Sequence, residues 1–442
     1  MSKNFSMPTD YQRAADYLEN LLKLKTIEEW KEKLSPKIPA RCDPDSPEKE
    51  KMEIDPGYSK QAFENRWEQI PTSPEIRNKI ADPQSEVDLP LYSRNIENYI
   101  GTVKVPVGIV GPLRVNGLFA QGDYYVPLAT TEAALVASYA RGSRLIREAG
   151  GCTALLLNEG ISRSPGFVFE NLIQIGEFAA WARKNIENFK IEAEKTTAHG
   201  KLIDGKITIE GNHVFLNFEF STGDASGQNM ATLAANAIYQ YILKKTPVKP
   251  TAHFLEANFS GDKKASALSF LSVRGKKVTA EAVLPANLVQ RHLNTSPEQM
   301  AAYYRISSAG SVLSGAMGIQ GHYANALAAF YIATGQDAAC VSESSVGLSR
   351  FEITKKGDLY ASATLPNLMV GSIGGGTGLP SQNACLKLLK LPINDSSRAA
   401  AEICAALCLA GELSIIGALS SGDFSRAHEL LSRRKKKKIK ES

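Results

Sequence analysis

The chain has 442 residues, of which 43% are hydrophobic and 22% charged, and its formal net charge is +5. This length and composition predict a globular protein of two or three domains with a large core. Residues 433–442 hold seven Lys or Arg and one Glu, a net charge of +6, which leaves −1 for the rest. The body of the chain therefore gives no general reason to expect a nucleic-acid partner, and none is expected.

The basic run RRKKKKIK near the C-terminus has two interpretations. A segment of like charges that buries nothing is typically a solvated, disordered end. The same charges also suit RNA, DNA or an anionic membrane. One hypothesis for the whole protein is therefore that its main function is to bind nucleic acid or a membrane through this tail, and the alternative is an enzyme. Deletion of residues 433–442 distinguishes them, because it should abolish the main function only in the first case.

Cysteine placement and hydropathy bear on the compartment. The first residues are polar and lack the apolar stretch of a signal peptide, and the six cysteines form no CxxC pair. These features predict a cytoplasmic protein without a metal site. Cys404 and Cys408 lie in an apolar helical pattern and are expected in the core. Glu412 interrupts the apolar run 403–422, which predicts a buried helix rather than a transmembrane anchor.

The first elements are helical. Residues 11–34 predict one or two short amphipathic helices, and residues 41–60, rich in Pro, Asp, Glu and Lys, predict an exposed connection. Residues 103–115 then predict a strand, a turn and a second strand. A helix is expected next, with Thr130 as its cap and Glu132 in its first turn.

Later elements alternate between the two types. Residues 213–220 (HVFLNFEF) alternate apolar and polar positions, which predicts a half-buried strand before a long helix. Further strands are expected in RGKKVTAEAVLP and LYASATLPNLMVG. The order is not a regular strand–helix–strand repetition, so the predicted class is α+β.

Two glycine-rich turns each join a strand to a helix: GDASGQN at residues 223–229 and GSIGGGTG at residues 371–378. Glycine lets the backbone approach a ligand, and the start of a helix favours phosphate. Neither turn matches GxGxxG or GxxxxGK[ST], so the motifs of a standard Rossmann fold or P-loop NTPase are missing. Taken singly, each turn fits a structural role as well as a nucleotide site.

Four titratable residues stand in unusual settings: Glu132, Lys263, Asp337 and His428. Each is a candidate for acid–base or electrostatic catalysis. Each also has a simpler explanation, namely a charge at a helix dipole, a surface turn, a helix cap and an exposed histidine. Spacing alone does not decide between them.

Seven segments together carry more information than any one motif. They occur in this order: ENYIGTVKVPVGIVGPL, TTEAALVAS, GDASGQNM, NFSGDKKA, GHYANALAAFYIATGQDAA, GSIGGGTGLPSQ and LAGELS. The series resembles the catalytic domain of 3-hydroxy-3-methylglutaryl-CoA reductases of the class found in eukaryotes and archaea, over about residues 97–428. The resemblance implies two-step reduction of 3-hydroxy-3-methylglutaryl-CoA to mevalonate and free CoA with a nicotinamide cofactor. The positive charge of Lys195, His199 and Lys201 favours NADPH over NADH.

The resemblance also implies an architecture. A helical N-terminal segment is expected at 1–96, and a large domain around a long central helix at 97–164 and 255–442. A small α/β nicotinamide-cofactor domain is expected as an insertion at 165–254. A homodimer or higher homo-oligomer with shared active sites is implied, in which the loop around Lys263 meets the ENYIG segment across the interface.

Site residues carry over position by position. The family's catalytic residues match Glu132, Lys263, Asp337 and His428. Its substrate-binding residues, including those near the CoA moiety, match Arg163, Asn258, Asp262, Lys264, Asn325, Ser138, Arg141 and Arg144. Its cofactor-binding residues match Asp224, Gly227, Gln228, Asn229, Gly374, Gly375, Gly376 and Thr377.

The expected chemistry explains these residue types. Hydride addition to a thioester makes an oxyanion, which the Lys263 ammonium would stabilise. His428 would protonate the departing CoA thiolate, and Glu132 would supply a proton to the aldehyde. Asp337 between Lys263 and Glu132 would couple their protonation states.

The sequence departs from the family pattern in places. Glu256 stands where a serine is usual, which leaves open a repelled substrate carboxylate, a pair with Arg163 or a lysine, or a different acyl-CoA substrate. Ser226 and Gln228 replace methionines of the cofactor loop. Ala198 falls near the usual reader of the cofactor's 2′-phosphate, although Lys195, His199 and Lys201 are close by. Arg434 occupies the position of a regulatory phosphorylation site.

Overall fold

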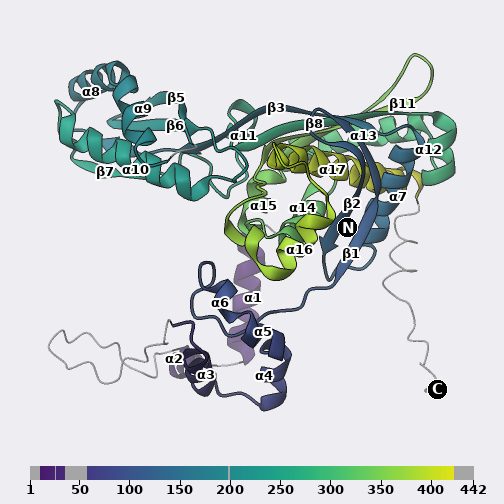
Figure 1. Ribbon diagram of the computed structural model, residues 1–442, viewed down its shortest axis with the longest axis horizontal. Helices are drawn as coiled ribbons and strands as arrows, with labels where there is room; N and C mark the ends of the chain where they lie inside the picture. The colour runs from purple at the N-terminus through teal and green to yellow at the C-terminus, as the bar shows by residue number, and fades with distance from the viewer. Residues whose placement is uncertain (1–9, 25, 35–56, 198–199, 423–442) are drawn as a thin grey trace, which may run out of the picture. The chain divides into compact units, whose positions relative to one another are not determined.

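The computed structural model describes residues 10–24, 26–34, 57–197 and 200–422 (Figure 1). The chain forms two compact units, Met1–Ile54 and Asp55–Ser442. The first contains α1 (Asp10–Leu24) and α2 (Ile27–Leu34), which are the amphipathic helices expected from the sequence. A capping box starts α2, since Thr26 N–H donates to Glu29 Oε2 at 2.8 Å and Glu29 N–H donates to Thr26 Oγ1 at 3.2 Å.

The second unit opens with four short helices that share a small core of their own. They are α3 (Lys60–Glu68), α4 (Pro74–Ile80), α5 (Pro83–Val87) and α6 (Leu89–Tyr92). Their core is built from Phe63, Trp67, Ala81, Leu89, Tyr92 and Tyr99. The side chains of Ser59, Ser73 and Asp82 accept hydrogen bonds at the starts of α3, α4 and α5.

A mixed sheet of eleven strands forms the centre of this unit, in the order β7-β4-β6-β3-β8-β11-β10-β9, with β1, β2 and β5 joined beside this path. Its strands are β1 (Val107–Gly117), β2 (Gln121–Ala129), β3 (Cys152–Arg163), β4 (Gly166–Val168), β5 (Leu202–Glu210), β6 (His213–Phe220), β7 (Ala252–Phe254), β8 (Gly275–Leu284), β9 (Gly318–Ile319), β10 (Gly347–Ile353) and β11 (Leu359–Leu368). The turn expected between residues 103 and 115 is instead a register shift within β1, between Val110 and Leu113, around Pro112. Proline has no amide hydrogen for the ladder, so the pairing slips without the strand ending.

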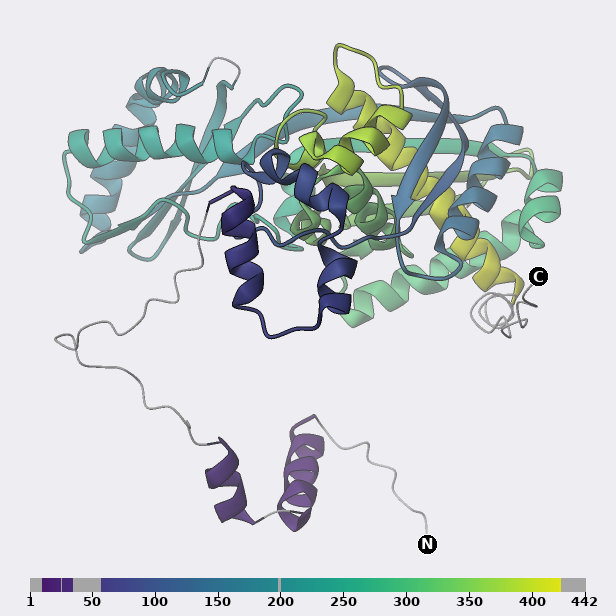
Figure 2. The same ribbon diagram turned by 60° about the horizontal axis from the view of Figure 1, so that its bottom comes forward.

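β3 belongs to both halves of the sheet. Its first part pairs with β8, from Thr153 opposite Glu281 to Gly160 opposite Gly275, and its last three residues pair with β6. Around that end of β3 gather β4–β7 with α8 (Leu172–Lys184), α9 (Ile186–Glu194) and α10 (Gln228–Lys245), as Figures 1 and 2 show. This is the part expected to form the inserted cofactor domain, and its boundaries at 165 and 254 stay a prediction.

The remaining helices pack with the larger half of the sheet. They are α7 (Leu135–Glu148), α11 (Leu268–Leu271), α12 (Ala286–Leu293), α13 (Pro297–Ser314), α14 (Tyr323–Thr334), α15 (Val341–Ser344), α16 (Pro380–Leu388) and α17 (Ser396–Ser421), with 3-10 turns η1 (Ala338–Cys340) and η2 (Gly375–Gly378). The mixture of helices with a largely antiparallel sheet is the expected α+β class.

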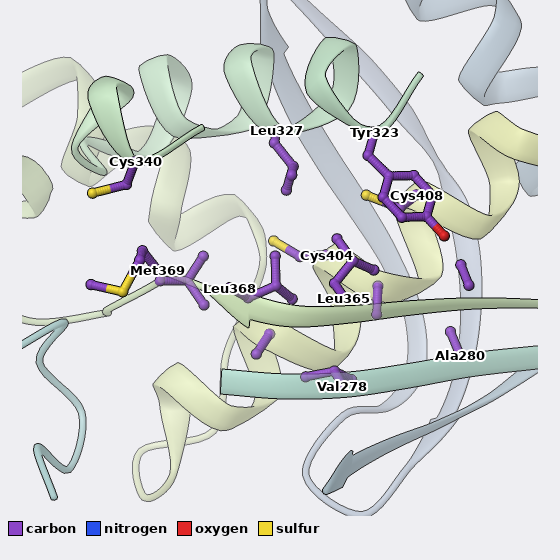
Figure 3. Close-up of a cluster of buried hydrophobic side chains, with 14 of the residues drawn as sticks. Val278, Ala280, Tyr323, Leu327, Cys340, Leu365, Leu368, Met369, Cys404 and Cys408 are labelled. Atoms are coloured by element: carbon purple, nitrogen blue, oxygen red, sulfur yellow. The ribbon is translucent and has the colours of Figure 1, made fainter. Parts of the chain in front are cut away.

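α17 is the central helix of this core. It is apolar on all sides, as a helix surrounded by protein is expected to be. It is long and apolar enough to cross a membrane, but 83% of its most apolar window is buried within the protein, as the charges in its sequence predicted. In Figure 3, Cys404 and Cys408 of α17 lie among Leu327 of α14 and Leu365 of β11, so both cysteines have the core role expected of them.

α7 and α17 approach each other very closely. A Cβ atom on Gly142 of α7 would lie 1.8 Å from the carbonyl oxygen of Ala410 in α17. Glycine is therefore required at this crossing, because any side chain would push the two helices apart. The crossing fixes the face of α7 that bears Ser138 and Arg141.

Candidate active site

Lys263 forms the central ion pair of the site. It lies in the loop between β7 and α11, and its Nζ is 2.9 Å from Asp337 Oδ2. Its backbone φ is 57°, in the left-handed region that non-glycine residues rarely adopt. Asp337 follows α14, and its other oxygen accepts the Ala339 N–H at 3.0 Å, so this aspartate is both a cap of η1 and an ion-pair partner.

The environment keeps both members of this pair charged. The hydrogen bond to Asp337 raises the pKa of Lys263 above its ordinary value. Burial alone would raise the pKa of Asp337, but hydrogen bonds from Lys263 and the Ala339 N–H outweigh burial and hold that pKa below its usual value. Lys263 is thus a fixed ammonium suited to stabilise an oxyanion.

Both glycine turns meet beside this pair in a cleft of about 770 Å³. The cleft is lined by Lys263, Asp337, Gly227, Gln228, Asn229, Gly374, Gly375, Gly376 and Thr377, among others. Lys263 is the one cationic side chain among the described residues of the lining. The two glycine turns expected to hold the cofactor and the expected catalytic residues Lys263 and Asp337 therefore share one cavity.

Backbone contacts lock the two turns together. Ala225 and Ile373 form a parallel bridge, and Ser372 N–H donates to the Asp224 carbonyl at 2.9 Å. A Cβ on Gly335 would lie 2.2 Å from the Gly376 carbonyl oxygen, which brings the segment before Asp337 against the second turn. Gly374 and Gly375 have φ of 80° and 55°, and no atom lies within 4 Å of their Cβ positions, so their backbone faces open space.

Asp224 is placed differently from the other residues of its turn. It is absent from the lining of the cleft, and its Oδ1 accepts the Ser397 N–H at 2.8 Å, at the start of α17. Its observed role is to attach the first glycine turn to the central helix. Direct contact of Asp224 with a cofactor stays a prediction.

Glu132 lies before a helix rather than in its first turn, contrary to the expectation from the sequence. Ala134 has a φ of 70°, so α7 begins only at Leu135, and no side chain caps it. Thr130 Oγ1 instead accepts the Glu132 N–H at 3.0 Å. This turn directs the Glu132 carboxylate to Asn325 of α14, whose Nδ2 donates to Oε2 at 2.8 Å.

The Glu132–Asn325 and Lys263–Asp337 pairs lie at opposite ends of α14. The stretch from Asn325 to Thr334 spans roughly 14 Å at the rise of an α-helix. Within one chain Asp337 therefore contacts Lys263 but not Glu132. Coupled protonation of Glu132, Lys263 and Asp337 stays a prediction, which would require a second copy of the chain.

A second group of polar side chains adjoins Lys263. Arg163, at the end of β3, places Nη1 3.1 Å from Asp262 Oδ2 and donates from Nε to Thr232 Oγ1 at 2.9 Å. Lys264 Nζ donates to the Asp262 carbonyl at 2.9 Å. The structure thus brings together Arg163, Asp262 and Lys264, as expected of a substrate-binding loop.

Glu256 is engaged by the backbone. Its Oε1 accepts the Asn258 N–H at 3.0 Å, and its Oε2 accepts the Ser164 N–H at 3.3 Å. Asn258 has a φ of 63°. Of the alternatives left open by the sequence, a pair with Arg163 or a lysine is absent among the described contacts of Glu256, and its carboxylate instead holds the loop around Asn258.

The remaining expected residues lie on one face of α7 or beyond the described chain. Ser138 Oγ is 2.8 Å from Ser414 Oγ, and Arg141 donates from Nη2 to the Ser414 carbonyl at 2.7 Å. Arg144 is exposed three residues further on. His428 lies outside the described residues, as do Ala198, His199 and the basic tail.

Two residues of the site went unnoticed in the sequence. Arg274 and Glu343 form a buried ion pair behind the loop that bears Lys263, with Nε 2.8 Å from Oε2. Arg274 lies in the segment VRGKK and Glu343 in the segment SESS, and both segments are as polar as an exposed turn. No local pattern separates such buried charges from solvated ones, because their burial depends on elements distant in the sequence.

A lysine–aspartate ion pair in a cleft walled by two glycine turns is the geometry of an α+β enzyme site that can stabilise an oxyanion. The chain belongs to the hydroxymethylglutaryl-coenzyme A reductase family, whose model matches residues 62–433. The family inferred from the ordered motifs is thereby confirmed.

Relatives place the chain near the archaeal enzymes. It is 42% identical over 351 residues to the 3-hydroxy-3-methylglutaryl-coenzyme A reductase of Pyrococcus abyssi, covering 78% of this chain and 86% of that one. It is 43% identical over 349 residues to that of Aeropyrum pernix, covering 78% and 83%. The plant enzyme 3-hydroxy-3-methylglutaryl-coenzyme A reductase 2 of Gossypium hirsutum is 36% identical over 74% of this chain and 53% of its own.

The fold recurs in a solved structure. The class II 3-hydroxy-3-methylglutaryl-CoA reductase of Streptococcus pneumoniae, bound to NADPH in open conformations, matches with a TM-score of 0.60. The match covers 78% of this chain and 84% of that one at 20% sequence identity. At this identity the likeness extends to the fold.

Proposed function

We propose that this protein reduces 3-hydroxy-3-methylglutaryl-CoA to mevalonate and free CoA, consuming two NADPH in turn, as a step of isoprenoid synthesis. The observation that carries the proposal is the Lys263–Asp337 ion pair, 2.9 Å apart, in the lining of the glycine-walled cleft. Membership of the reductase family supplies the substrate class.

The cleft fits a nicotinamide dinucleotide, because the Gly374–Gly375 backbone faces open space and Gln228 and Asn229 begin a helix at its wall. When bound, that cofactor supplies hydride to the substrate carbonyl. Gly374, Gly375, Gly376, Thr377, Gly227, Gln228 and Asn229 are the residues that would hold it.

The chain's own residues stabilise the developing negative charge and transfer the protons. Lys263 donates a hydrogen bond to the oxyanion that develops on the thioester carbonyl, while Asp337 keeps the ammonium charged. His428 gives a proton to the departing thiolate, and Glu132 gives a proton to the aldehyde oxygen in the second reduction. Arg163, with Asn258 and Lys264, binds the free carboxylate of the substrate.

The proposed enzyme is a cytoplasmic homodimer or higher homo-oligomer. Glu132 and Lys263 of one chain lie at opposite ends of α14, so a site that uses both is completed when a second copy supplies one of them. This arrangement supports shared active sites.

The direct test is an absorbance assay of NADPH oxidation with a panel of acyl-CoA thioesters. Hydroxymethylglutaryl-CoA is expected to be reduced with the highest kcat/KM, and mevalonate and free CoA should accumulate as products. The alternative, that Glu256 adapts the site to another acyl-CoA, predicts higher kcat/KM for a thioester without a free carboxylate. Engagement of Glu256 by the Asn258 and Ser164 N–H groups favours hydroxymethylglutaryl-CoA.

A further inference from the structure

Arg274 and Glu343 form an ion pair that is withdrawn from solvent. The Arg274 side chain is 3% exposed and the Glu343 side chain 0% exposed. Neither lines the cleft. Burial of two charges is costly unless each is fully bonded, so their remaining contacts indicate what the pair does.

The contacts of this pair lead to the loop that bears the reacting lysine. Glu343 uses Oε2 for Arg274, and its Oε1 accepts the backbone N–H of Lys263 at 3.2 Å. Arg274 also pairs through Nη2 with Asp262, the residue before Lys263, and donates from Nη1 to the Ser162 carbonyl at 2.8 Å. Two adjacent loop residues are thus attached to one buried pair.

The attachment coincides with an unfavourable backbone conformation. Lys263 has a φ of 57°, and a lysine at this angle needs neighbouring contacts to hold it there. The Glu343 carboxylate supplies the contact to its N–H, while Asp262 is held by Arg274 and Arg163. The direction of the Lys263 side chain toward Asp337 depends on this conformation.

Further hydrogen bonds connect Arg274 to the strand β11. Arg274 N–H donates to Asn367 Oδ1 at 3.0 Å, and Asn367 Nδ2 donates to Ser269 Oγ at 2.8 Å. Glu343 belongs to α15, which follows the turn that bears Asp337. The segment 337–343 therefore contacts Lys263 twice, at its ammonium and at its backbone.

We propose that Glu343 and Arg274 are positioning residues for the reaction, which act through the Lys263 backbone to keep its ammonium on Asp337 at the cleft. This inference rests on the proposed function. A pair that only stabilised the fold would leave the chemistry of the folded enzyme unchanged when it is altered.

The test compares two buried glutamates changed in the same way. Glu343→Gln retains an oxygen for the Lys263 N–H but turns an amide toward the Arg274 guanidinium, which breaks the pair. Glu402→Gln is the control, because Glu402 is equally buried and accepts the Leu118, Phe119 and Ala120 N–H groups, with no contact to the cleft lining. Arg274→Lys is the second test variant, since one ammonium cannot hold Glu343, Asp262 and the Ser162 carbonyl together.

For Glu343→Gln, kcat for hydroxymethylglutaryl-CoA should fall roughly 10- to 100-fold, as expected when a reacting group is displaced, with KM for NADPH within about twofold of wild type. The acid limb of kcat should also move to higher pH. Asp337 acts as a carboxylate, its pKa is lowered by Lys263, and a displaced ammonium lets that pKa rise. Glu402→Gln should lower the unfolding temperature without moving this limb.

Equal kcat values per folded molecule for Glu343→Gln and Glu402→Gln, or an unmoved acid limb, would overturn the inference while the wild-type assay still supports the proposed function. Should Glu343→Gln fail to fold, Arg274→Lys is judged by the same two criteria. Wild-type protein inactive toward hydroxymethylglutaryl-CoA would overturn the proposed function and this inference with it.

Discussion

At the scale of single residues, the Lys263 ammonium is the charge on which the proposed chemistry depends. Lys263→Ala should lower kcat by on the order of 10²-fold or more, because it removes the main stabiliser of the oxyanion. Steady-state assays of purified protein measure this loss. Lys356→Ala, an exposed lysine in the turn between β10 and β11, is the control. Wild-type turnover in Lys263→Ala would contradict the assignment.

His428 is expected to act in the first reduction alone. The thioester expels a thiolate that needs a proton, whereas free mevaldate has none to expel. His428→Gln should therefore block reduction of hydroxymethylglutaryl-CoA far more than reduction of mevaldate. Equal losses on both substrates would assign His428 another role.

Lys201 is the residue that we expect to favour NADPH over NADH. A Cβ on Gly200 would lie 2.2 Å from Met230 Sδ, and Met230 lines the cleft, so the start of β5 adjoins the cofactor site. Lys195, by contrast, is paired with Glu192 at 2.7 Å. Lys201→Ala should lower kcat/KM for NADPH by about tenfold, the size of one charge–phosphate contact, and leave NADH unchanged. Lys195→Ala is the matched control, and a preference for NADPH that survives Lys201→Ala would rule out this reader.

The sequence predicted site residues correctly where several motifs occurred together in order. It missed residues whose role depends on being buried in the folded protein. The seven ordered segments identified the family, and both glycine turns line one cleft as a cofactor site would require. Arg274 and Glu343 were missed because their polar surroundings in sequence resemble surface turns. A positive φ at Ala134 likewise leaves no trace in the helical pattern that predicted an earlier start for α7.

At the scale of elements, the crossing of α7 and α17 connects the core to the site. Gly142→Ala should destabilise the protein by about 1–3 kcal/mol, since its methyl group would overlap the Ala410 carbonyl. It should also raise KM for the acyl-CoA, because Ser138 and Arg141 lie on the displaced face. Thermal unfolding and steady-state kinetics measure the two effects.

Gly176→Ala in α8 provides the comparison for this crossing. No atom lies within 4 Å of its Cβ position, so alanine should be neutral or slightly stabilising there. An unfolding temperature for Gly142→Ala equal to that of Gly176→Ala would contradict the close approach of the two helices.

The helix α17 shows why element type was more predictable than element contacts. An apolar run of helical length with two buried glutamates was correctly expected in the core. Its partners could not be inferred, because they come from β8, β11, α7 and α14, which are far apart in sequence. Long-range packing of this kind leaves no periodic signal in a single chain.

At the scale of the whole molecule, the length of α14 argues for a site shared between copies. Glu132→Gln and Lys263→Ala should each be inactive alone. Co-expressed, they should recover about a quarter of wild-type activity, since about half of the dimers are mixed and each of those contains one intact site. Purification through a different tag on each chain isolates the mixed dimers.

Mixed dimers as inactive as the single variants would show that Glu132 and Lys263 of one site belong to the same chain. A control dimer in which one chain carries both altered residues and the other chain is wild type should give the opposite result. With shared sites, each site of this dimer contains one altered residue and the dimer should be inactive, whereas sites built within one chain would retain about half of the activity.

The strand β3 also limits how this architecture can change over evolutionary time. Arg163 reaches Asp262 because β3 pairs first with β8, with one register shift between Leu156 and Asn158, and then with β6 up to Arg163. Insertion of one residue into β3 would turn every later side chain to the opposite face. The loops between α8 and α10 can therefore lengthen during evolution and change the cofactor preference. The length of β3 is more constrained, because Arg163 at its end must contact Asp262 of the substrate loop.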